Sequence, residues 1–387
     1  MRLNKKTLKN SYPKRSLSGF FFTYSTYIGL FSPYLSLWLN FKGFSASQIG
    51  ILMSPLQWSR IVGPPFWGWI TDSRADTIEP KKIIQVSSFF AVLSSILLFF
   101  DWSFYYLFLV LSLVSFFLSG QMPIAESLTM EFCSENIGKY GKIRLWGSIG
   151  FIFAVLAGGL TFDYYGIVYI PVTLSISLLL LIFVSFLLPS RVSPKVSKKN
   201  DEKKIFNSKS INFLLASFFM LVAHAPLYTL YSLWLENNGY SKLQIGLIWS
   251  IGVLAEIIFF NFQFAIFKRF EVKKVWVFCF AITTLRFFFL AFSNGSLLVI
   301  VLTQMLHSLT FAAHHSASIS LVNQLFPKNA QARGQSLYTM ASYGLGGAIG
   351  GVTAGYVWEN FFPEASFLLS VIASLFGIFF AFRTIKI

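Results

Sequence analysis

Apolar runs of about 20 residues recur along the whole chain, and they constrain its fold more than any other feature. An α-helix needs roughly 20 residues to cross a hydrocarbon core about 30 Å thick. Only 12% of the 387 residues are charged, whereas soluble domains contain about a quarter. Twelve spans are predicted, at 17–40, 48–70, 83–100, 103–130, 143–163, 167–188, 211–235, 243–267, 274–292, 296–321, 334–358 and 362–382. An all-α polytopic membrane protein with twelve transmembrane helices is therefore expected.

The net charge of +16 follows the predicted membrane topology. If both termini share one side, 27 of the 31 Lys and Arg residues fall in the tails and loops of that side. Basic residues gather on the cytoplasmic side of membrane proteins, so both termini are predicted to be cytoplasmic. Topology accounts for the charge, which argues against a nucleic-acid partner. The lipid bilayer of a bacterial-type inner (plasma) membrane is the expected environment.

The sequence gives no sign of a metal site, a cofactor or an enzyme. Cys133 falls in a predicted loop and Cys279 in a predicted span, so a disulfide between them is not expected. Nucleotide-binding loops, EF-hands and HExxH motifs are absent from the sequence. No cofactor and no metal are therefore predicted.

The chain contains a duplication. Residues 36–54, SLWLNFKGFSASQIGILMS, align without gaps to 232–250, SLWLENNGYSKLQIGLIWS, at an offset of 196, and ten of nineteen positions are identical. An even number of predicted spans separates the copies, so the two repeats run parallel. The predicted domains are a six-helix bundle at 1–188, a cytoplasmic linker at 189–210 and a second six-helix bundle at 211–387. Transporters built this way bind substrate near the midplane, between halves that rock about it.

Few charged side chains fall inside the predicted spans. Away from the ends of the spans they are Arg60, Glu126, Glu256 and Arg286, and Arg144 lies at a cytoplasmic end. A charge at the membrane centre costs at least about 2.5 kcal/mol, and such residues usually mark pathways and coupling sites. The offset of 196 relates Arg60 to Glu256, so equivalent helices carry opposite charges at the same depth. A functional pair is the favoured interpretation, and a buried structural salt bridge is the alternative.

Three of the four histidines lie in LHSLTFAAHHSAS, residues 306–318. His307, Thr310 and His314 are spaced to share one face of a straight α-helix, and His315 falls off that face. His307 and His314 are interpreted as hydrogen-bonding or proton-handling groups, because imidazole titrates closest to physiological pH. For His315, a packing role is as good an interpretation as a hydrogen-bonding or proton-handling role.

Aromatic stripes accompany these polar groups. Tyr27 belongs to a stripe in the first span, and Tyr228 lies near Pro226 in the seventh span, which is predicted to be broken by this proline. Such stripes usually pack in a core. A cavity wall that stacks a flat substrate is the other interpretation, because a buried tyrosine hydroxyl needs a partner.

Several motifs carry a family resemblance. GKIRLWGSIGF (141–151), VLAEIIFF (253–260), TLRFFFLAFS (284–293) and LHSLTF (306–311) resemble the lactose permease group of the major facilitator superfamily, and within it the phenylpropionate permease branch. The resemblance covers most of the chain. It implies the major facilitator fold and proton-coupled transport of a small molecule.

The resemblance also implies residue roles. Glu126, Arg144 and Glu256 fall where the permeases hold substrate by charge-assisted hydrogen bonds. Thr310 stands where the permeases have the carboxylate that carries the coupled proton, so the carrier is left open between Glu256, Glu126 and the histidines. The predicted substrate-binding residues are Glu126, Arg144, Phe151, Glu256, Tyr27 and Tyr228. The predicted proton-coupling residues are Glu256, Arg286, His307, His314 and Arg60.

The segment GWITDSRADTIEPKK, residues 68–82, resembles the signature loop of the superfamily between spans 2 and 3. Gly68, Asp72 and the basic residues fit this signature, but the glycine and arginines that usually follow are missing. A conformational role is predicted for this loop.

Charge arithmetic bears on the substrate. Arg60, Arg144 and Arg286 exceed Glu126 and Glu256 by one charge, which favours a small aromatic monocarboxylate such as 3-phenylpropionate. If Arg144 is solvated at the cytoplasmic end, the charges balance and a neutral sugar or nucleoside fits instead. A monomeric proton symporter for uptake is expected. A drug or metabolite antiporter and a transporter-like sensor are the less favoured alternatives.

Overall fold

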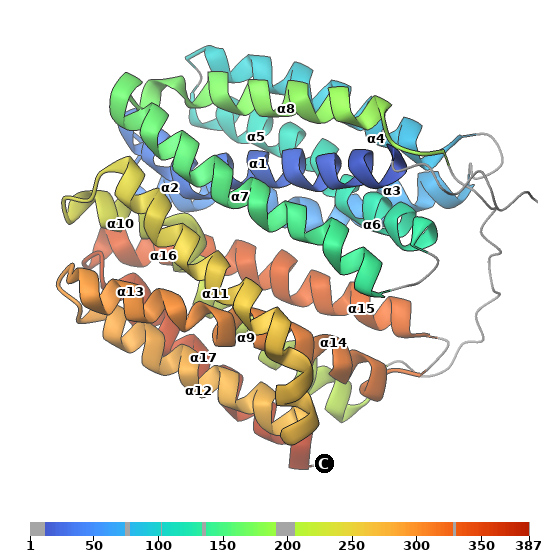
Figure 1. Cartoon of the computed structure of the whole chain (residues 1–387). Helices are drawn as coiled ribbons and strands as arrows, with labels where there is room; N and C mark the ends of the chain where they lie inside the picture. The colour runs from blue at the N-terminus through green and yellow to red at the C-terminus, as the bar shows by residue number, and fades with distance from the viewer. Residues whose placement is uncertain are drawn as a thin grey trace, which may run out of the picture.

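The computed structural model describes residues 12–73, 78–101, 103–133, 137–190, 206–327 and 330–386. Helices joined by short connections make up these residues, which contain no β-strand (Figure 1). Each of the twelve predicted spans corresponds to one helical segment, continuous or broken.

The first six spans extend from α1 to α8. In chain order they are α1 (Tyr12–Phe41); α2 (Ala46–Met53) with α3 (Pro55–Ser73); α4 (Pro80–Ile96) with η2 (Leu97–Phe99); α5 (Phe104–Ser119) with α6 (Gln121–Phe132); α7 (Ile137–Tyr165); and η3 (Ile167–Tyr169) with α8 (Ile170–Phe186).

The second six spans extend from α9 to α17. They are α9 (Ser208–Thr229) with α10 (Tyr231–Asn237); α11 (Lys242–Arg269); α12 (Val272–Ala291); α13 (Leu297–Met305) with η4 (Ser308–Ala313) and α14 (His314–Leu325); α15 (Gln331–Thr339) with η6 (Met340–Gly346) and α16 (Gly347–Asn360); and α17 (Ala365–Lys386). The break between α9 and α10 lies at Leu230, one turn after Pro226.

Nine of the helical segments in the described residues are long and apolar enough to cross a membrane by length and composition alone. The other three are α1, α2 with α3, and α15 with η6 and α16; Ser, Thr, Gly and Pro dilute their apolar residues. All three contact helices of the other half of the chain. Because these contacts give the segments protein partners, their lower hydropathy is compatible with a place inside a membrane.

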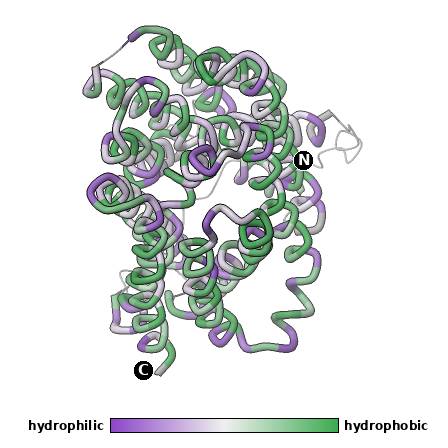
Figure 2. The backbone as a smooth tube through the Cα atoms, turned by 90° about the vertical axis from the view of Figure 1, so that its left-hand side faces the viewer, coloured by the Kyte–Doolittle hydropathy of each residue, from purple (hydrophilic) through white to green (hydrophobic). Residues whose placement is uncertain are grey.

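Apolar side chains cover much of the outer surface. Tyr105 and Phe264 are 81% and 80% exposed, which suits contact with lipid. Figure 2 shows hydrophobic residues along most of the helices and hydrophilic ones mainly in turns and at helix ends.

The duplicated segment folds the same way twice. Gly43 and Gly239 adopt φ values of 87° and 86° in the turns before α2 and α11, a conformation that favours glycine. Ser45 and Ser241 then cap these helices, each in a capping box with the glutamine three residues later. The backbone of the first repeat is therefore reproduced in the second.

The two sets of six spans meet side by side, with α1 and α3 to α8 above α9 and α11 to α17 in Figure 1. We call the end of the molecule where α8 ends and α9 begins the linker end, and the end with the turns at Gly43 and Gly239 the turn end. Near the turn end, α7 packs against α11 and α2 packs against α16. Residues 191–205 of the predicted linker lie outside the described residues.

Candidate functional site

Arg286 on α12 is the centre of a buried polar cluster. Its side chain is 1% exposed, and its Nη1 donates to His307 Nδ1 (2.9 Å) and to Thr310 Oγ1 (2.9 Å). Its Nη2 donates to Gln304 Oε1 (3.2 Å). On the far side of the imidazole, His307 Nε2 lies 3.0 Å from Glu256 Oε1 on α11. Three helical segments, α11, α12 and α13 with η4, thus converge on one guanidinium.

The partners of His307 determine its tautomer. A guanidinium has only donors, so His307 Nδ1 accepts from Arg286 and carries no proton. We therefore assign the single ring proton to Nε2, which donates to Glu256. A second proton on His307 would break its hydrogen bond with Arg286. Glu256 is consequently better placed than His307 to take up a proton.

His224 on α9 extends the cluster. Its Nδ1 lies 2.9 Å from the Met220 carbonyl, which can only accept, so Nδ1 carries the ring proton. Its Nε2 then accepts from Thr310 Oγ1 at 3.1 Å. Thr310 accepts from Arg286 and donates to His224, which links α12, η4 and α9. Neither His224 nor Gln304 was among the predicted site residues, although a histidine in an apolar span is itself a signal.

A π-helical segment, η4, follows His307 directly. Such segments have a wider turn than an α-helix and often occur at functional sites. Beyond it, His314 stacks on Trp276 (6.0 Å between ring centroids) and meets Phe280 edge to face. The expectation that His314 shares one straight α-helical face with His307 and Thr310 is therefore wrong, because η4 changes the register between them.

Arg144 and Glu126 form a pair between α7 and α6, nearer the linker end. Arg144 Nε lies 3.4 Å from Glu126 Oε1, and the two side chains are 40% and 39% exposed. The guanidinium also lies 5.2 Å from the ring of Phe21 on α1. An ion pair this exposed contributes little to stability.

Aromatic side chains meet where the two halves face each other. Phe151 on α7 lies 6.3 Å from Trp249 on α11, and Tyr228 on α9 stacks near the same indole at 6.5 Å. Trp249 is oriented by a hydrogen bond from Nε1 to Ser232 Oγ (3.0 Å). These contacts bring the predicted residues Phe151 and Tyr228 together.

Tyr27 lies apart from this aromatic group. It is 1% exposed, and its ring lies 5.5 Å from that of Phe31 on the same helix. These contacts are those of a packing residue, which was one of the two interpretations of the aromatic stripe.

Arg60 on α3 is separate from the Arg286 cluster. Its Nη1 donates to Gln57 Oε1 (3.1 Å) on the same helix, and its guanidinium lies 5.5 Å from the ring of Tyr343 on η6. Among the described residues no carboxylate lies within ion-pair distance of it, and Glu256 is bonded to His307 instead. The alternative of a direct Arg60–Glu256 salt bridge is thus not realised.

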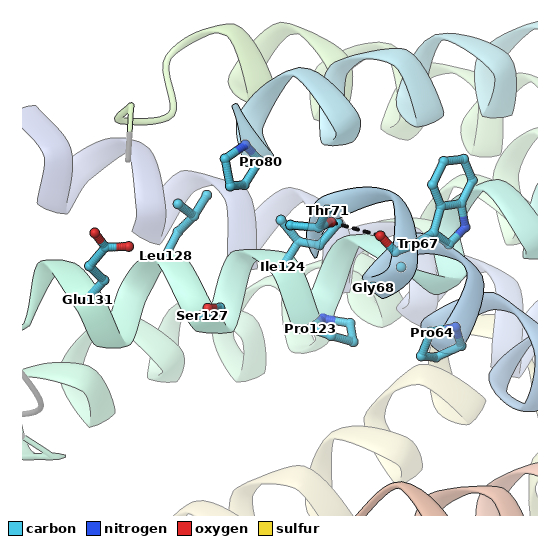
Figure 3. A pocket seen from close by; sticks show the side chains of 11 residues that line it. Pro64, Trp67, Gly68, Thr71, Pro80, Pro123, Ile124, Ser127, Leu128 and Glu131 are labelled. Atoms are coloured by element: carbon cyan, nitrogen blue, oxygen red, sulfur yellow. Dashed lines mark hydrogen bonds between the residues drawn. The ribbon is translucent and has the colours of Figure 1, made fainter. Parts of the chain in front are cut away.

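Gly68 lines a cavity of about 170 Å³ between α3 and α6, near the linker end. Figure 3 shows its wall, with Trp67 and Thr71 on one helix and Pro123 and Ile124 on the other. A Cβ at Gly68 would meet no atom within 4 Å, so close packing does not demand glycine there. The side chain of Asp72, the other residue predicted for this loop, and residues 74–77 lie outside the described residues.

Comparison with known proteins identifies the family. Residues 14–369 match the model of the MFS_1 like family. The chain belongs to that family. It is 27% identical over 366 residues to an uncharacterized transporter, YwbF, of Bacillus subtilis, covering 94% of this chain and 91% of the relative. It is 25% identical over 365 residues to a protein of Escherichia coli named "Probable 3-phenylpropionic acid transporter", covering 91% and 93%.

Solved structures agree on the fold. The crystal structure of the nucleoside transporter NupG superimposes with a TM-score of 0.78 at 18% identity, over 96% of this chain and 98% of the other. The predicted resemblance and fold class are therefore confirmed. This member of the MFS_1 like family is a multi-pass membrane transporter of small solutes.

Proposed function

We propose that the chain is a proton-coupled symporter that takes up a small aromatic monocarboxylate such as 3-phenylpropionate. The observation that carries this proposal is the charge arrangement of the site. Arg144 is paired with Glu126, and His307 bridges Arg286 to Glu256. Arg60 adds a positive charge with no carboxylate partner in the described part of the chain. An anion entering this region would compensate that charge.

The aromatic lining supports a flat substrate. Tyr343 lies against the guanidinium of Arg60, while Phe151, Tyr228 and Trp249 meet between the halves. A carboxylate held by Arg60 would leave an attached ring free to stack on these side chains.

Glu256 is the proposed carrier of the coupled proton. Both imidazoles of the cluster are neutral and already use both ring nitrogens, so they have no free site for another proton. Protonation of Glu256 would remove the negative charge that faces His307 and Arg286. The cluster would then be free to rearrange along α11, which packs against α7 of the other half. Thr310 acts here as a neutral link.

For the orientation, we propose an inner (plasma) membrane location with both termini in the cytoplasm, a monomer, and the division into 1–188, 189–210 and 211–387. The bias of basic residues toward the tails and the linker side supports the orientation. Since α7–α11 and α2–α16 pack near the turn end, the proposed orientation places this closed end on the side of the membrane opposite the cytoplasm.

A neutral sugar or nucleoside is the second candidate. Arg144 is 40% exposed, and if water compensates its charge, the remaining charges of the site balance. Such a substrate would be held by hydrogen bonds to the Arg144–Glu126 pair.

The test is uptake into proteoliposomes with an imposed inward proton gradient. Labelled 3-phenylpropionate, lactose and uridine are compared, with an ionophore as one control and protein-free liposomes to measure passive entry of the undissociated acid. Protein-dependent phenylpropionate uptake that the ionophore abolishes is the expected result. Uptake of lactose or uridine alone would replace the substrate and keep the coupling. Uptake that persists in the presence of the ionophore would overturn the proposed proton coupling. Binding without uptake would indicate a sensor.

A further inference from the structure

Two carboxylates at the turn end each reach across to a helix of the other half. Asp163, in the last turn of α7, accepts from the backbone N–H groups of Lys242 (2.8 Å, Oδ1) and Leu243 (2.9 Å, Oδ2) at the start of α11. Glu359, in the last turn of α16, accepts through Oε2 from the Ser47 N–H (2.8 Å) and the Ser45 hydroxyl (2.7 Å) at the start of α2. Each half therefore contributes one carboxylate and the N-terminus of one helix.

The two contacts are equivalent by sequence. Asp163 and Glu359 are 196 residues apart, which is the offset of the duplication, and so are Ser45 and Ser241, the N-cap residues of the two helices they reach. The contact from α7 to α11 is therefore repeated, with the halves exchanged, from α16 to α2. The aligned segments 36–54 and 232–250 include neither Asp163 nor Glu359, so the duplication alone did not predict these two contacts.

The backbone of each contacted helix explains what the carboxylates bind. The first N–H groups of an α-helix have no partner within the helix. In both helices the capping box satisfies the third of them, at Gln48 and Gln244. The carboxylate of the other half takes groups that the box leaves open: the first and second N–H in α11, and the second in α2. An anion at this position is also favoured by the helix dipole.

Glycines let the backbones come together beside these contacts. A Cβ at Gly50 would lie 2.6 Å from the Gly351 carbonyl, and a Cβ at Gly246 would clash with the Val155 carbonyl. Gly50 and Gly246 are again 196 residues apart. The turn end is thus closed by backbone contact that only glycine permits.

We propose that Asp163 and Glu359 form a paired latch, which holds the turn end closed and must release each time the transporter opens to that side. Both carboxylates are exposed, so water can replace the helix N–H groups when the halves part. The two contacts lie on different helix pairs, so opening requires both to be broken. The latch goes beyond the proposed function: it depends on the two halves rocking against each other, and not on which substrate is carried or on proton coupling.

The test measures the distance between spin labels across the turn end, in lipid nanodiscs and without substrate. Labels are placed by cysteine substitution at Tyr105 and Leu298, which are 81% and 69% exposed on α5 and α13. The native cysteines, Cys133 and Cys279, are buried, and the unsubstituted protein serves as a control for their labelling. Double electron–electron resonance then gives the populations of closed and open turn ends.

The variants separate the latch from general effects of charge. Asp163→Asn and Glu359→Gln are each expected to raise the open population about threefold, the effect of one carboxylate at an exposed helix N-terminus, and together about tenfold. Asp163→Glu and Glu359→Asp keep the charge and are expected to retain most of the closure. The matched control is Asp101→Asn, because Asp101 pairs with Lys42 at the same end but within one half. It is expected to leave the distances unchanged.

Three results would overturn the latch. They are an unchanged distribution in the double variant, an equal opening in Asp101→Asn, and an open turn end already dominant in the parent protein. Failure of phenylpropionate uptake would leave this measurement valid, since no substrate is used. The two proposals can therefore fail independently.

Discussion

Arg60→Gln tests the substrate charge most directly. The guanidinium contacts Gln57 and the Tyr343 ring and faces no carboxylate in the described residues, so its removal leaves no buried charge uncompensated. We expect the variant to fold. A hydrogen bond to a charged group contributes about 1.5 to 3 kcal/mol, and the lower end applies because Arg60 is only partly buried. A loss of about 1.5 kcal/mol corresponds to a roughly tenfold rise in Kd.

The assay is calorimetric titration of the protein in nanodiscs with 3-phenylpropionate and with its neutral amide, 3-phenylpropanamide. The acid is expected to bind about tenfold more weakly to the variant, and the amide equally well to both proteins. Arg383→Gln is the matched control, because Arg383 also lies over an aromatic ring, that of Phe379 at 4.5 Å, but on α17.

Two outcomes would refute the reasoning about Arg60. If acid and amide lose the same affinity, Arg60 supports the shape of the site and does not bind the carboxylate. If Arg383→Gln weakens the acid as much, the effect comes from the total charge of the protein.

Three further predictions address the cluster and the turn end. Glu256→Gln keeps a partner for His307 but cannot exchange a proton; accumulation against a gradient should vanish while substrate exchange across the membrane persists, and full accumulation would contradict this. Gln304→Leu removes an acceptor from the buried Arg286 and should destabilise the protein by about 1.5 kcal/mol, seen as a lower thermal midpoint; an unchanged midpoint would speak against it. Gly246→Val should increase the spin-label distance across the turn end, because the new Cβ clashes with the Val155 carbonyl; an unchanged distance would contradict close backbone packing at this position.

The spans and the duplication were predictable because each rests on a local rule. The thickness of the hydrocarbon core requires about 20 apolar residues per span, whatever the helices pack against. The duplicated turns need glycine at positive φ and a serine cap, and Gly43, Ser45 and their counterparts Gly239 and Ser241 carry both signals in the sequence.

The arrangement of the site depends on contacts that no local pattern encodes. The spacing of His307 and His314 predicts one face only for a regular α-helix, and η4 widens the turn between them. Arg60 and Glu256 occupy equivalent positions, but equivalent positions belong to different halves and need not touch. The contact of Asp163 could not be predicted, because carboxylates are common at the ends of spans and no local pattern indicates that this one reaches α11 in the other half.

The hydrogen-bond chain from Arg286 through Thr310 and His224 to the Met220 carbonyl has a fixed polarity. A guanidinium that only donates stands at one end, and a carbonyl that only accepts stands at the other. Relay of a proton by successive hops requires every link to reverse direction afterwards, and neither end can do so. This hydrogen-bond chain therefore does not relay protons. A proton on Glu256 would therefore have no exit route through Thr310 and His224.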